Sequence, residues 1–240
     1  MRMDATKNGK PPGAASSHNR IFDVIKTLQS SPRPFADERT IKGALSALQR
    51  GPIHFCRNNV IACEGDAADY IFLVVSGVVR TCKTFQNGTR NVVAFYLPGD
   101  LFGLDDQKCA LSAEAATDAM VLFIKRSGLL SLAARESRVS SFLLAVTTGE
   151  LRRAREHGLL MNRNAKCRVA TFLTDLSKRL GKTGSIDLPM SHQDIADHLG
   201  LTIETLSRTI TGLEQSGVIA RASPRTLTVR NQYSLTRLMT

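Results

Sequence analysis

The chain has 240 residues, of which 42% are hydrophobic and 22% charged, close to the usage of ordinary globular proteins. This composition excludes a disordered chain and a coiled-coil rod, and the length suits two small domains. Lys and Arg number 32 against 21 Asp and Glu, a formal net charge of +11, so we expect an acidic partner. No stretch of about 18 apolar residues is present, and residues 1–20 lack the apolar core of a secretory signal. The sequence therefore predicts a cytoplasmic protein without membrane contact.

The cysteines of the chain are widely spaced, and their number is odd. This pattern matches neither a disulfide framework nor a zinc site, so we expect free thiols in a reducing compartment and no bound metal. The sequence also has no phosphate-binding loop, nucleophile elbow or paired catalytic constellation. We therefore expect that the protein is not an enzyme and carries no cofactor. The cysteines are Cys56, Cys63, Cys82, Cys109 and Cys167.

The N-terminal segment divides into a polar part and two apolar-periodic parts. Residues 1–20 are rich in Lys, Asn, Gly, Pro, Ala and Ser, which favours a disordered tail. Residues 21–28 and 37–48 place apolar side chains at helical spacing, and Pro- or Gly-containing breakers follow each segment. We predict two short helices there, the first of which opens a domain of residues 21–128.

Residues 53–125 consist of short β-rich runs that are separated by turn signals. The strongest of these signals is Asn87-Gly88, because both residues tolerate the positive φ angles of a tight hairpin. Regularly spaced short strands with one apolar face predict an antiparallel β-roll of about 75 residues. The expected strands cover residues 59–62, 70–76, 78–85, 90–96 and 119–125.

A long helix is predicted after the roll. The helix covers residues 129–160, and the segment that contains it is residues 129–161. The segment contains no proline, and its apolar residues form a narrow stripe. Because a core helix usually has a wider apolar face, the stripe is compatible with two alternatives: a seam against a second copy of the chain, or packing on the roll. We expect the seam of a homodimer to contain Val139, Leu143 and Val146.

The last segment, residues 162–240, contains the clearest signals for where helices begin and end. Ser191 and Thr202 are each placed to cap the start of a helix, and Gly200 between them is placed to end the first helix. Small Ala196 lies four residues before that glycine, where two steeply crossed helices approach closely. This pattern predicts a helix-turn-helix motif. The expected buried stripe of its second helix is Ile203, Leu206, Ile210 and Leu213.

With this stripe buried, Glu204, Ser207 and Arg208 face outward near the start of the second helix. An arginine can donate two hydrogen bonds to guanine, and a glutamate can accept from the cytosine amino group. Glu204 can also buttress Arg208, which lies at i, i+4 spacing. The alternative is that the two residues form only an ordinary surface ion pair, which contributes a few tenths of a kcal/mol. The helix caps, the glycine and the local positive charge all indicate a DNA-binding helix-turn-helix. We therefore favour double-stranded DNA as the partner, with these three residues as base readers.

Two further β-prone runs, residues 218–220 and 226–229, predict a two-stranded wing after the motif. Residues 151–240 hold 14 Lys and Arg against 7 Asp and Glu, so the excess positive charge is concentrated around the predicted motif. Helix N-termini and wing arginines are suited to phosphate oxygens. The candidate phosphate contacts are Ser191, His192, Gln193, Thr202, Thr205, Arg221 and Arg225.

The order of roll, long helix and winged helix-turn-helix resembles the Crp/Fnr superfamily of bacterial transcription regulators over residues 21–235. Within the roll the resemblance rests on Glu-Gly-Asp at 64–66 and Leu-Pro-Gly-Asp-Leu-Phe-Gly at 97–103. In the second helix it rests on the E-x-x-S-R pattern, and apolar Ile203 before the Glu is similar to the FixK/Fnr branch. The resemblance implies an α+β fold and a homodimeric activator that reads a TTGAT-type inverted repeat. It also implies contact with RNA polymerase, through a loop near residues 181–188, and control of microaerobic, anaerobic or nitrogen-fixation genes.

Members of this superfamily differ in what the roll senses. Cyclic-nucleotide binders resemble Phe-Gly-Glu followed by an Arg-Ser/Thr pair, whereas this chain has Phe-Gly-Leu at 102–104 and Leu-Ser-Ala at 111–113. No cysteine precedes Cys56, so the iron–sulfur cluster of Fnr is not expected, and Ser191 stands where some FixK-like proteins have a redox cysteine. The remaining alternatives are a Crp-type regulator gated by a small molecule and a metalloenzyme built on the roll. Only His54 lies near the roll, which disfavours the metalloenzyme.

Overall fold

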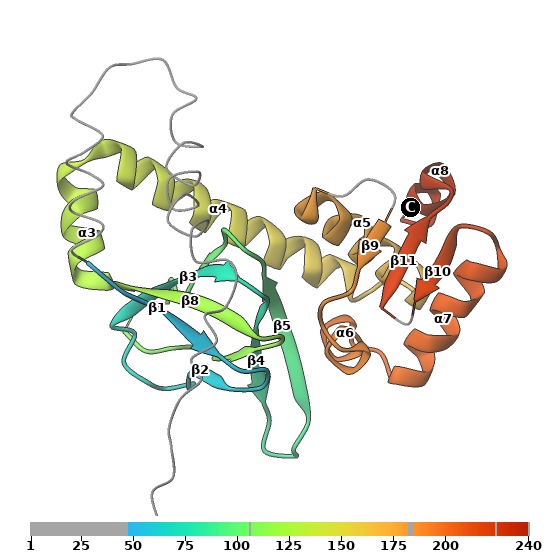
Figure 1. Cartoon of the computed structure of the whole chain (residues 1–240), viewed down its shortest axis with the longest axis horizontal. Helices are drawn as coiled ribbons and strands as arrows, with labels where there is room; N and C mark the ends of the chain where they lie inside the picture. Colours follow the sequence, from blue (N-terminus) through green and yellow to red (C-terminus); the bar gives the residue numbers. More distant parts are fainter. Residues whose placement is uncertain (1–47, 106, 182–184, 224, 240) are drawn as a thin grey trace, which may run out of the picture. The chain divides into compact units, whose positions relative to one another are not determined.

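The computed structural model describes residues 48–105, 107–181, 185–223 and 225–239 (Figure 1). The predicted tail of residues 1–20 and the predicted helices at 21–28 and 37–48 lie outside the described residues, apart from Leu48. All described residues belong to one compact unit of the chain. Their strands and helices follow the order expected from the sequence, with the differences given below.

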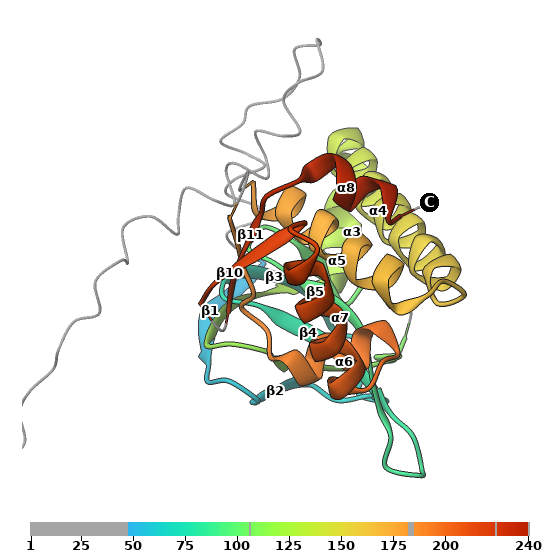
Figure 2. The ribbon, with the colours of Figure 1, turned by 90° about the vertical axis from the view of Figure 1, so that its right-hand side faces the viewer.

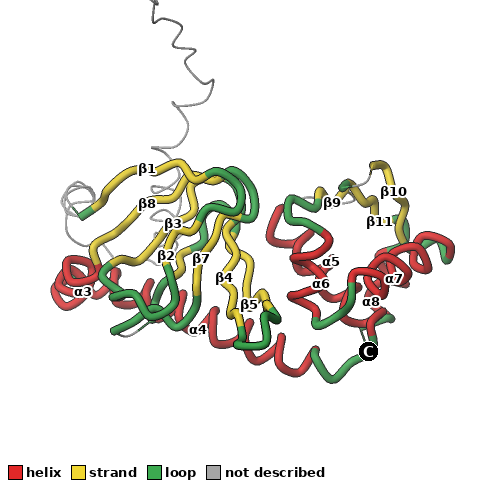
Figure 3. The backbone as a smooth tube through the Cα atoms, turned by 90° about the horizontal axis from the view of Figure 1, so that it is seen from below, coloured by secondary structure: helices red, strands yellow, loops and turns green. Residues whose placement is uncertain are grey.

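The elements occur in the order of their sequence positions, and Figure 3 distinguishes them by colour. The roll contains β1 (Gln49–Phe55), β2 (Val60–Ala62), β3 (Tyr70–Ser76), β4 (Val79–Thr84), β5 (Arg90–Tyr96), β6 (Leu101–Phe102), β7 (Ser112–Ala115) and β8 (Ala119–Lys125). The helices α3 (Arg126–Arg135), α4 (Ser137–Leu160) and α5 (Ala165–Leu180) follow. The last elements are β9 (Ser185–Asp187), α6 (His192–Leu199), α7 (Ile203–Gln215), β10 (Ile219–Ser223), β11 (Thr226–Val229) and α8 (Gln232–Arg237).

The strands of the roll form two antiparallel four-stranded sheets, with strand orders β1-β8-β3-β6 and β2-β7-β4-β5. The inward side chains of both sheets form one core. Phe72 of β3 stacks on Phe102 of β6 with ring centroids 4.9 Å apart, and Val79 of β4 and Val121 of β8 are fully buried beside them. The antiparallel β-roll predicted from alternating apolar runs and turn signals is therefore confirmed.

The β4–β5 hairpin forms at the predicted Asn-Gly turn. The side-chain oxygen of Asn87 accepts a hydrogen bond from the backbone N–H of Thr89 at 3.0 Å, and Gly88 adopts a φ of 78°. A side chain is strained at that φ, so glycine stabilises the turn. Strands β1, β6, β7 and β9 were not predicted, because they are short or lack apolar alternation.

Two helices occupy the segment for which one long helix was predicted. The backbone of Glu136 is extended, with φ −120° and ψ 102°, and its N–H closes α3 by donating to the carbonyl of Leu132. Helix α4 then begins at Ser137, and the hydroxyl of Ser140 donates to the carbonyl of Ala133 across the break. Because neither Pro nor Gly occurs at the break, periodicity alone could not locate it.

The C-terminal domain packs α5, α6, α7 and α8 against a three-stranded sheet of order β10-β11-β9, and Figure 2 views it from the side of α6 and α7. Helix α5 begins at Ala165 and is capped by Asn164, whose side-chain oxygen accepts from the backbone N–H of Cys167. Ala196 of α6 is fully buried, as expected for close helix crossing, and Leu199 and Leu206 are fully buried in the same core. The predicted two-stranded wing corresponds to β10 and β11, which pair antiparallel.

Candidate nucleic-acid interface

Side chains and one glycine define the ends of α6 and α7 as the sequence predicted. The hydroxyl of Ser191 accepts from the backbone N–H of Asp194 at 3.0 Å, and that of Thr202 accepts from the N–H of Thr205 at 3.1 Å. The Thr202 hydroxyl also lies 3.0 Å from the hydroxyl of half-buried Thr205. Between the helices, Gly200 adopts the left-handed conformation with φ 59° and ψ 40°. Two short capped helices joined by a tight turn form a helix-turn-helix.

The inner face of α7 anchors this helix in the domain core. Leu206, Ile210 and Leu213 are buried, as predicted. Thr209 is also buried, and its hydroxyl donates to the carbonyl one turn earlier. Ile203 differs from the prediction, because 38% of it is exposed at the first position of the helix. The core face therefore begins at Leu206, one turn later than the stripe predicted.

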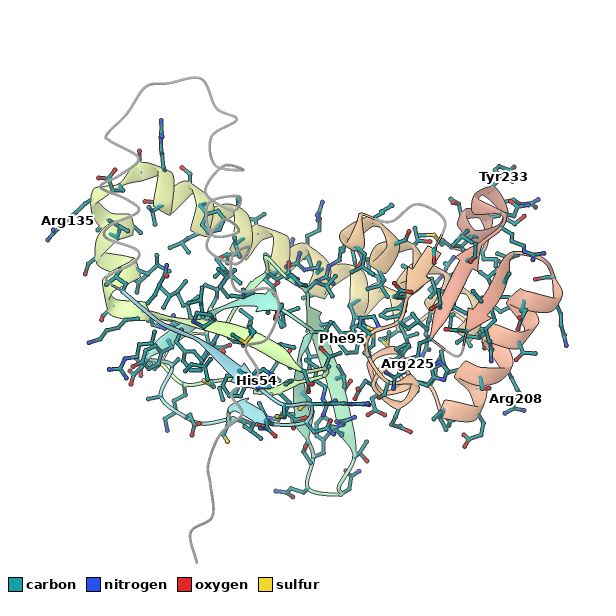
Figure 4. The ribbon with its side chains drawn as sticks, in the orientation of Figure 1. His54, Phe95, Arg135, Arg208, Arg225 and Tyr233 are labelled. Atoms are coloured by element: carbon teal, nitrogen blue, oxygen red, sulfur yellow. The ribbon has the colours of Figure 1, made fainter. Side chains whose placement is uncertain are left out.

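The outer face of α7 presents the three residues predicted to read bases. Glu204, Ser207 and Arg208 are all exposed, and Figure 4 shows the Arg208 side chain on the outer side of α7. An exposed guanidinium near the start of a helix can enter the major groove and donate to a base edge. The structure thus brings these three residues together on one accessible surface.

The expected ion pair between Glu204 and Arg208 does not form among the described residues, because no nitrogen–oxygen distance between them is within 4.0 Å. The pKa of Glu204 is lowered, first by a hydrogen bond to its own backbone N–H, then by the Thr202 hydroxyl, with a smaller effect of the Arg208 charge. The carboxylate thus interacts with the N-terminus of α7, where the helix dipole favours negative charge. Arg208 remains free to meet a base.

The N-terminus of α6 combines internal hydrogen bonds with free backbone donors. The Ser191 hydroxyl donates to Asp194 Oδ2 at 2.7 Å, and the Gln193 side chain donates to Asp197 Oδ1 at 2.7 Å. These two side chains, both predicted to contact phosphate, therefore stabilise the helix. The backbone N–H groups of His192 and Gln193 belong to the first turn, where no intrahelical acceptor exists. These N–H groups are the donors that α6 can offer to a phosphate.

The wing adds positive charge beside this helix end. Arg221 of β10 and Arg225, which precedes β11, are exposed. The pKa of His192 is lowered, first by partial burial and then by the charges of Arg221 and Arg225, so these three residues are electrostatic neighbours. Arg221 also lies 3.8 Å from the carboxylate of Glu214. His192 of α6 and the wing residues Arg221 and Arg225, all predicted to contact phosphate, therefore lie on one surface.

The residues predicted to form a dimer seam on α4 are mostly covered by the chain itself. Val139 is 5% exposed, and Leu143 and Val146 are half-buried. The strongly exposed apolar side chains of α4 are instead Leu144, Leu151 and Leu159, at 68%, 49% and 72%. Leu144 and Leu151 are seven residues apart, a heptad spacing that the sequence contained and the prediction did not use.

A cavity of about 320 Å³ lies between the roll and α4. Aromatic Phe72, Tyr96 and Phe102 line it, and the charged lining residues are Asp105 and Glu150. The Tyr96 hydroxyl donates to Glu150 at 3.1 Å, and burial, followed by the Glu150 charge, raises the pKa of the phenol. Because both charged groups are acidic, the lining does not fit a cyclic phosphate, which needs a cation or several donors.

In the part of the chain that the structure describes, there is no metal site and no helix that could cross a membrane, and the cysteines are free thiols. There, no group of three or more His, Cys, Asp or Glu residues is arranged to hold a metal ion. No described helix combines the length and the apolar character needed to cross a membrane. Cys82, Cys109 and Cys167 are buried free thiols, and Cys56 and Cys63 are exposed free thiols.

Two family models match the chain. Residues 52–136 match the cyclic nucleotide-binding domain, and residues 167–238 match the Crp-like helix-turn-helix domain. The nitrogen fixation regulation protein FixK of Azorhizobium caulinodans is 42% identical over 210 residues, which cover 85% of each chain. The FixK protein of Rhizobium meliloti is 37% identical over 180 residues, which cover 74% of this chain and 82% of that protein.

Among solved structures, FixK2 from Bradyrhizobium japonicum superposes with a TM-score of 0.75 at 40% identity. The match covers 78% of this chain and 96% of FixK2. The α+β fold, with an antiparallel roll and a winged helix-turn-helix, agrees with this neighbour and with both family models. These matches confirm the resemblance stated from the sequence, and the relatives are regulators rather than enzymes. The chain therefore belongs to the Crp/Fnr family, as a FixK/Fnr-type transcription regulator with a helix-turn-helix DNA-binding domain.

Proposed function

We propose that the protein is a homodimeric activator that reads a TTGAT-type inverted repeat through Glu204, Ser207 and Arg208. The single observation that carries this proposal is the exposure of all three residues on α7, directly after the capped α6–α7 turn. Arg208 donates two hydrogen bonds to the O6 and N7 atoms of one guanine, and Glu204 accepts from a cytosine amino group. Ser207 contacts a neighbouring base or phosphate.

Affinity comes from a second group of residues that contact the phosphates. The backbone N–H groups at the starts of α6 and α7 approach phosphate oxygens, and Arg221 and Arg225 add charge beside His192. Ser191, Gln193, Thr202 and Thr205 support these helix ends through the internal hydrogen bonds described above. This division assigns base choice to α7 and general affinity to α6 and the wing.

The dimer forms along α4. Val139 is buried within the chain, so the seam consists of exposed Leu144, Leu151 and Leu159, with half-buried Leu143 and Val146 at its edge. A twofold axis along this seam presents two α7 helices to successive major grooves of an inverted repeat, about 34 Å apart. The paired arrangement explains why a palindrome, rather than a single half-site, is the expected target.

The regulatory setting follows from the relatives. Proteins named for nitrogen fixation regulation and FnrL of Cereibacter sphaeroides, named a transcriptional activator, resemble this chain. We infer a cytoplasmic activator of microaerobic, anaerobic or nitrogen-fixation genes that contacts RNA polymerase. The candidate contact surface is residues 181–188, of which residues 182–184 lie outside the described residues and Ser185–Asp187 form β9. Transcription in vitro from a promoter carrying the palindrome, with and without the protein, tests activation directly.

A gel-shift titration with purified protein tests the proposal. The probes are a duplex with the inverted repeat, a duplex with one half-site, and a duplex of the same composition with both half-sites scrambled. We expect tight, specific binding to the repeat, weak binding to the half-site and only salt-sensitive background binding to the scrambled duplex. Equal affinity for all three duplexes contradicts the proposal, as does footprint protection that does not cover both half-sites.

A second candidate function is a Crp-type regulator gated by a small molecule, and the cavity between the roll and α4 favours it. Because the lining is aromatic and acidic, its occupant is a neutral or cationic small molecule rather than a nucleotide. Protein purified after denaturation and refolding carries no ligand. Specific binding of the repeat by this refolded protein favours the ungated activator, and restoration of binding only after addition of a cell extract favours the gated one.

A further inference from the structure

Arg80 of β4 is an arginine with almost no solvent contact. Only 3% of the residue is exposed, and its Nη1 donates to both carboxylate oxygens of Asp194 on α6, each at 3.0 Å. Its Nε and Nη2 donate to Glu114 Oε2 at 3.0 and 2.6 Å, and Nη2 also donates to Asn58 Oδ1 at 3.1 Å. The guanidinium thus joins β4 to the first helix of the helix-turn-helix, 114 positions further along the chain.

A second arginine reinforces the same connection. Nη2 of Arg90, at the start of β5, donates to Asp194 Oδ1 at 2.7 Å and to Asp197 Oδ2 at 2.9 Å. Asp194 is 1% exposed, so its charge is fully withdrawn from water and is compensated by both guanidinium groups. The hydrogen bonds to Asp197 and Asp194 raise the pKa of Arg90 although its burial lowers it. Arg90 therefore stays charged at every physiological pH.

Apolar contacts accompany the ion pairs between the roll and the C-terminal domain. Val92 and Phe95 of β5 belong to the same buried cluster as Phe172 of α5 and Ile195 of α6 (Figure 4 labels Phe95). Beside them, His198 of α6 donates to the carbonyl of Val92 at 3.0 Å. An apolar surface alone tolerates sliding, whereas a buried pair with directed hydrogen bonds admits few relative orientations.

We propose that Arg80 is a positioning residue for DNA recognition, which fixes the helix-turn-helix in one orientation and thereby sets the half-site spacing that a dimer accepts. This inference rests on the proposed function, because spacing has meaning only for a dimer on a palindrome. Asp194 accepts the Arg80 hydrogen bonds and is also hydrogen-bonded to Ser191 at the start of α6. The start of α6 is therefore held in a fixed position relative to β4. Because the tight turn at Gly200 joins α6 directly to α7, the orientation of α7 is fixed as well.

The pair acts on placement, not on base choice. Glu204, Ser207 and Arg208 are exposed while α6 is held against the roll, so the reading surface is free in this arrangement. If Arg80 is lost, Asp194 is left as a buried charge with weaker compensation, and the helix-turn-helix separates from β4 and β5. Each motif still reads its half-site, but the distance between the two motifs is no longer fixed.

Arg80→Gln and wild type are compared on palindromes whose half-sites are separated by the natural spacer and by spacers one or two base pairs shorter or longer. We expect wild type to prefer one spacing by about 100-fold, and Arg80→Gln to bind that duplex about tenfold or more weakly. The ratio between spacings should fall to about tenfold or less in the variant, because both motifs now adapt to each duplex. Discrimination against single-base changes within a half-site should remain as in wild type.

Lys83→Ala is the matched control. Lys83 lies on the same strand and forms an ion pair with Glu64 of the roll, and both side chains are 39% exposed. We expect this variant to retain the affinity and the spacing preference of wild type. Arg80→Lys tests the directed hydrogen bonds, because lysine keeps the charge but has one donor group for three partners. We expect an intermediate spacing ratio for it.

If Arg80→Gln does not fold, the same measurements are made on Arg90→Gln. The Arg90 side chain is 28% exposed, and Asp194 keeps its ion pair with Arg80 when Arg90 is lost. Circular dichroism and sedimentation establish that each variant is a folded dimer. A folded Arg80→Gln or Arg90→Gln dimer with the wild-type spacing ratio overturns the inference, as does an equal loss at all spacings or tighter binding to the natural spacer. Failure of wild type to prefer any palindrome overturns the proposed function instead.

Discussion

The imidazole rings of His157, near the end of α4, and His198 of α6 stack with centroids 4.4 Å apart. His198 Nδ1 donates to the carbonyl of Val92, and Phe95 and Phe172 contact its ring edge-on. Burial, followed by His157, lowers the pKa of His198 to about 4, and burial followed by Arg168 lowers the pKa of His157. The contact between the end of α4 and α6 therefore depends on neutral rings.

Acid is expected to destabilise the fold through His198. Its folded-state pKa of about 4 lies below the unfolded value of about 6.5, so the unfolded chain binds the proton first. The stability that neutral His198 contributes is fully present above pH 6.5 and is lost as the pH falls towards 4, by about 3 kcal/mol in total. Urea unfolding of wild type and His198→Gln at pH 7 and 4.5 measures this loss, which should be smaller in the variant. Exposed His54→Gln is the control, and identical losses in all three proteins contradict the assignment.

DNA binding is expected to strengthen in mild acid through His192. Burial and the charges of Arg221 and Arg225 lower the pKa of His192 in the free protein, whereas a phosphate beside the ring raises it. Binding is therefore coupled to proton uptake, and affinity should rise as the pH falls below about 6.5. Fluorescence anisotropy at pH 7.5 and 6.0 measures the effect, and His192→Gln should abolish it. An equal pH dependence in His192→Gln shows that another group is responsible.

The proposed dimer seam can be tested with one exposed leucine on each of two neighbouring helices. Leu144→Glu introduces a charge into the α4 seam and should weaken dimerisation about tenfold or more, because two carboxylates meet across the twofold axis. Leu130→Glu on α3 is the matched control, because Leu130 is 50% exposed and lies outside the seam. Sedimentation equilibrium measures both dissociation constants. If the two variants dimerise equally well, the seam lies elsewhere.

Arg225→Ala is expected to weaken binding to every duplex by the same factor, because the wing contacts phosphates rather than bases. Removing one phosphate contact should also reduce the slope of log affinity against log salt by about one. Titrations at several salt concentrations, on the repeat and on the scrambled duplex, give both quantities. A loss confined to the repeat contradicts a phosphate role for Arg225.

Local signals in the sequence predicted the helix-turn-helix almost completely. Ser191, Gly200 and Thr202 act on their own backbone or on residues within three positions, so their roles can be read without tertiary information. The Asn87-Gly88 hairpin was predictable for the same reason. Ile203 is the exception, because a helical stripe does not show that its first turn extends beyond the core.

Long-range relationships could not be predicted in this way. The partners Arg80 and Asp194 are 114 positions apart, and each has an ordinary local context for a strand and a helix start. The division of the long helix at Glu136 has no glycine or proline to mark it. Val139 matched a dimer seam in spacing, but only the fold shows that the chain itself covers it. Tertiary packing decided all three features.

Arg208 is proposed to read one guanine in each half of an inverted repeat. The most direct measurement compares wild type and Arg208→Ala on the repeat and on duplexes in which each half-site base pair is changed in turn. We predict that the variant loses discrimination at one G·C pair, worth about 1–3 kcal/mol, and keeps it at the other positions. An equal loss of affinity on every duplex, including the scrambled one, would show that Arg208 does not read a base.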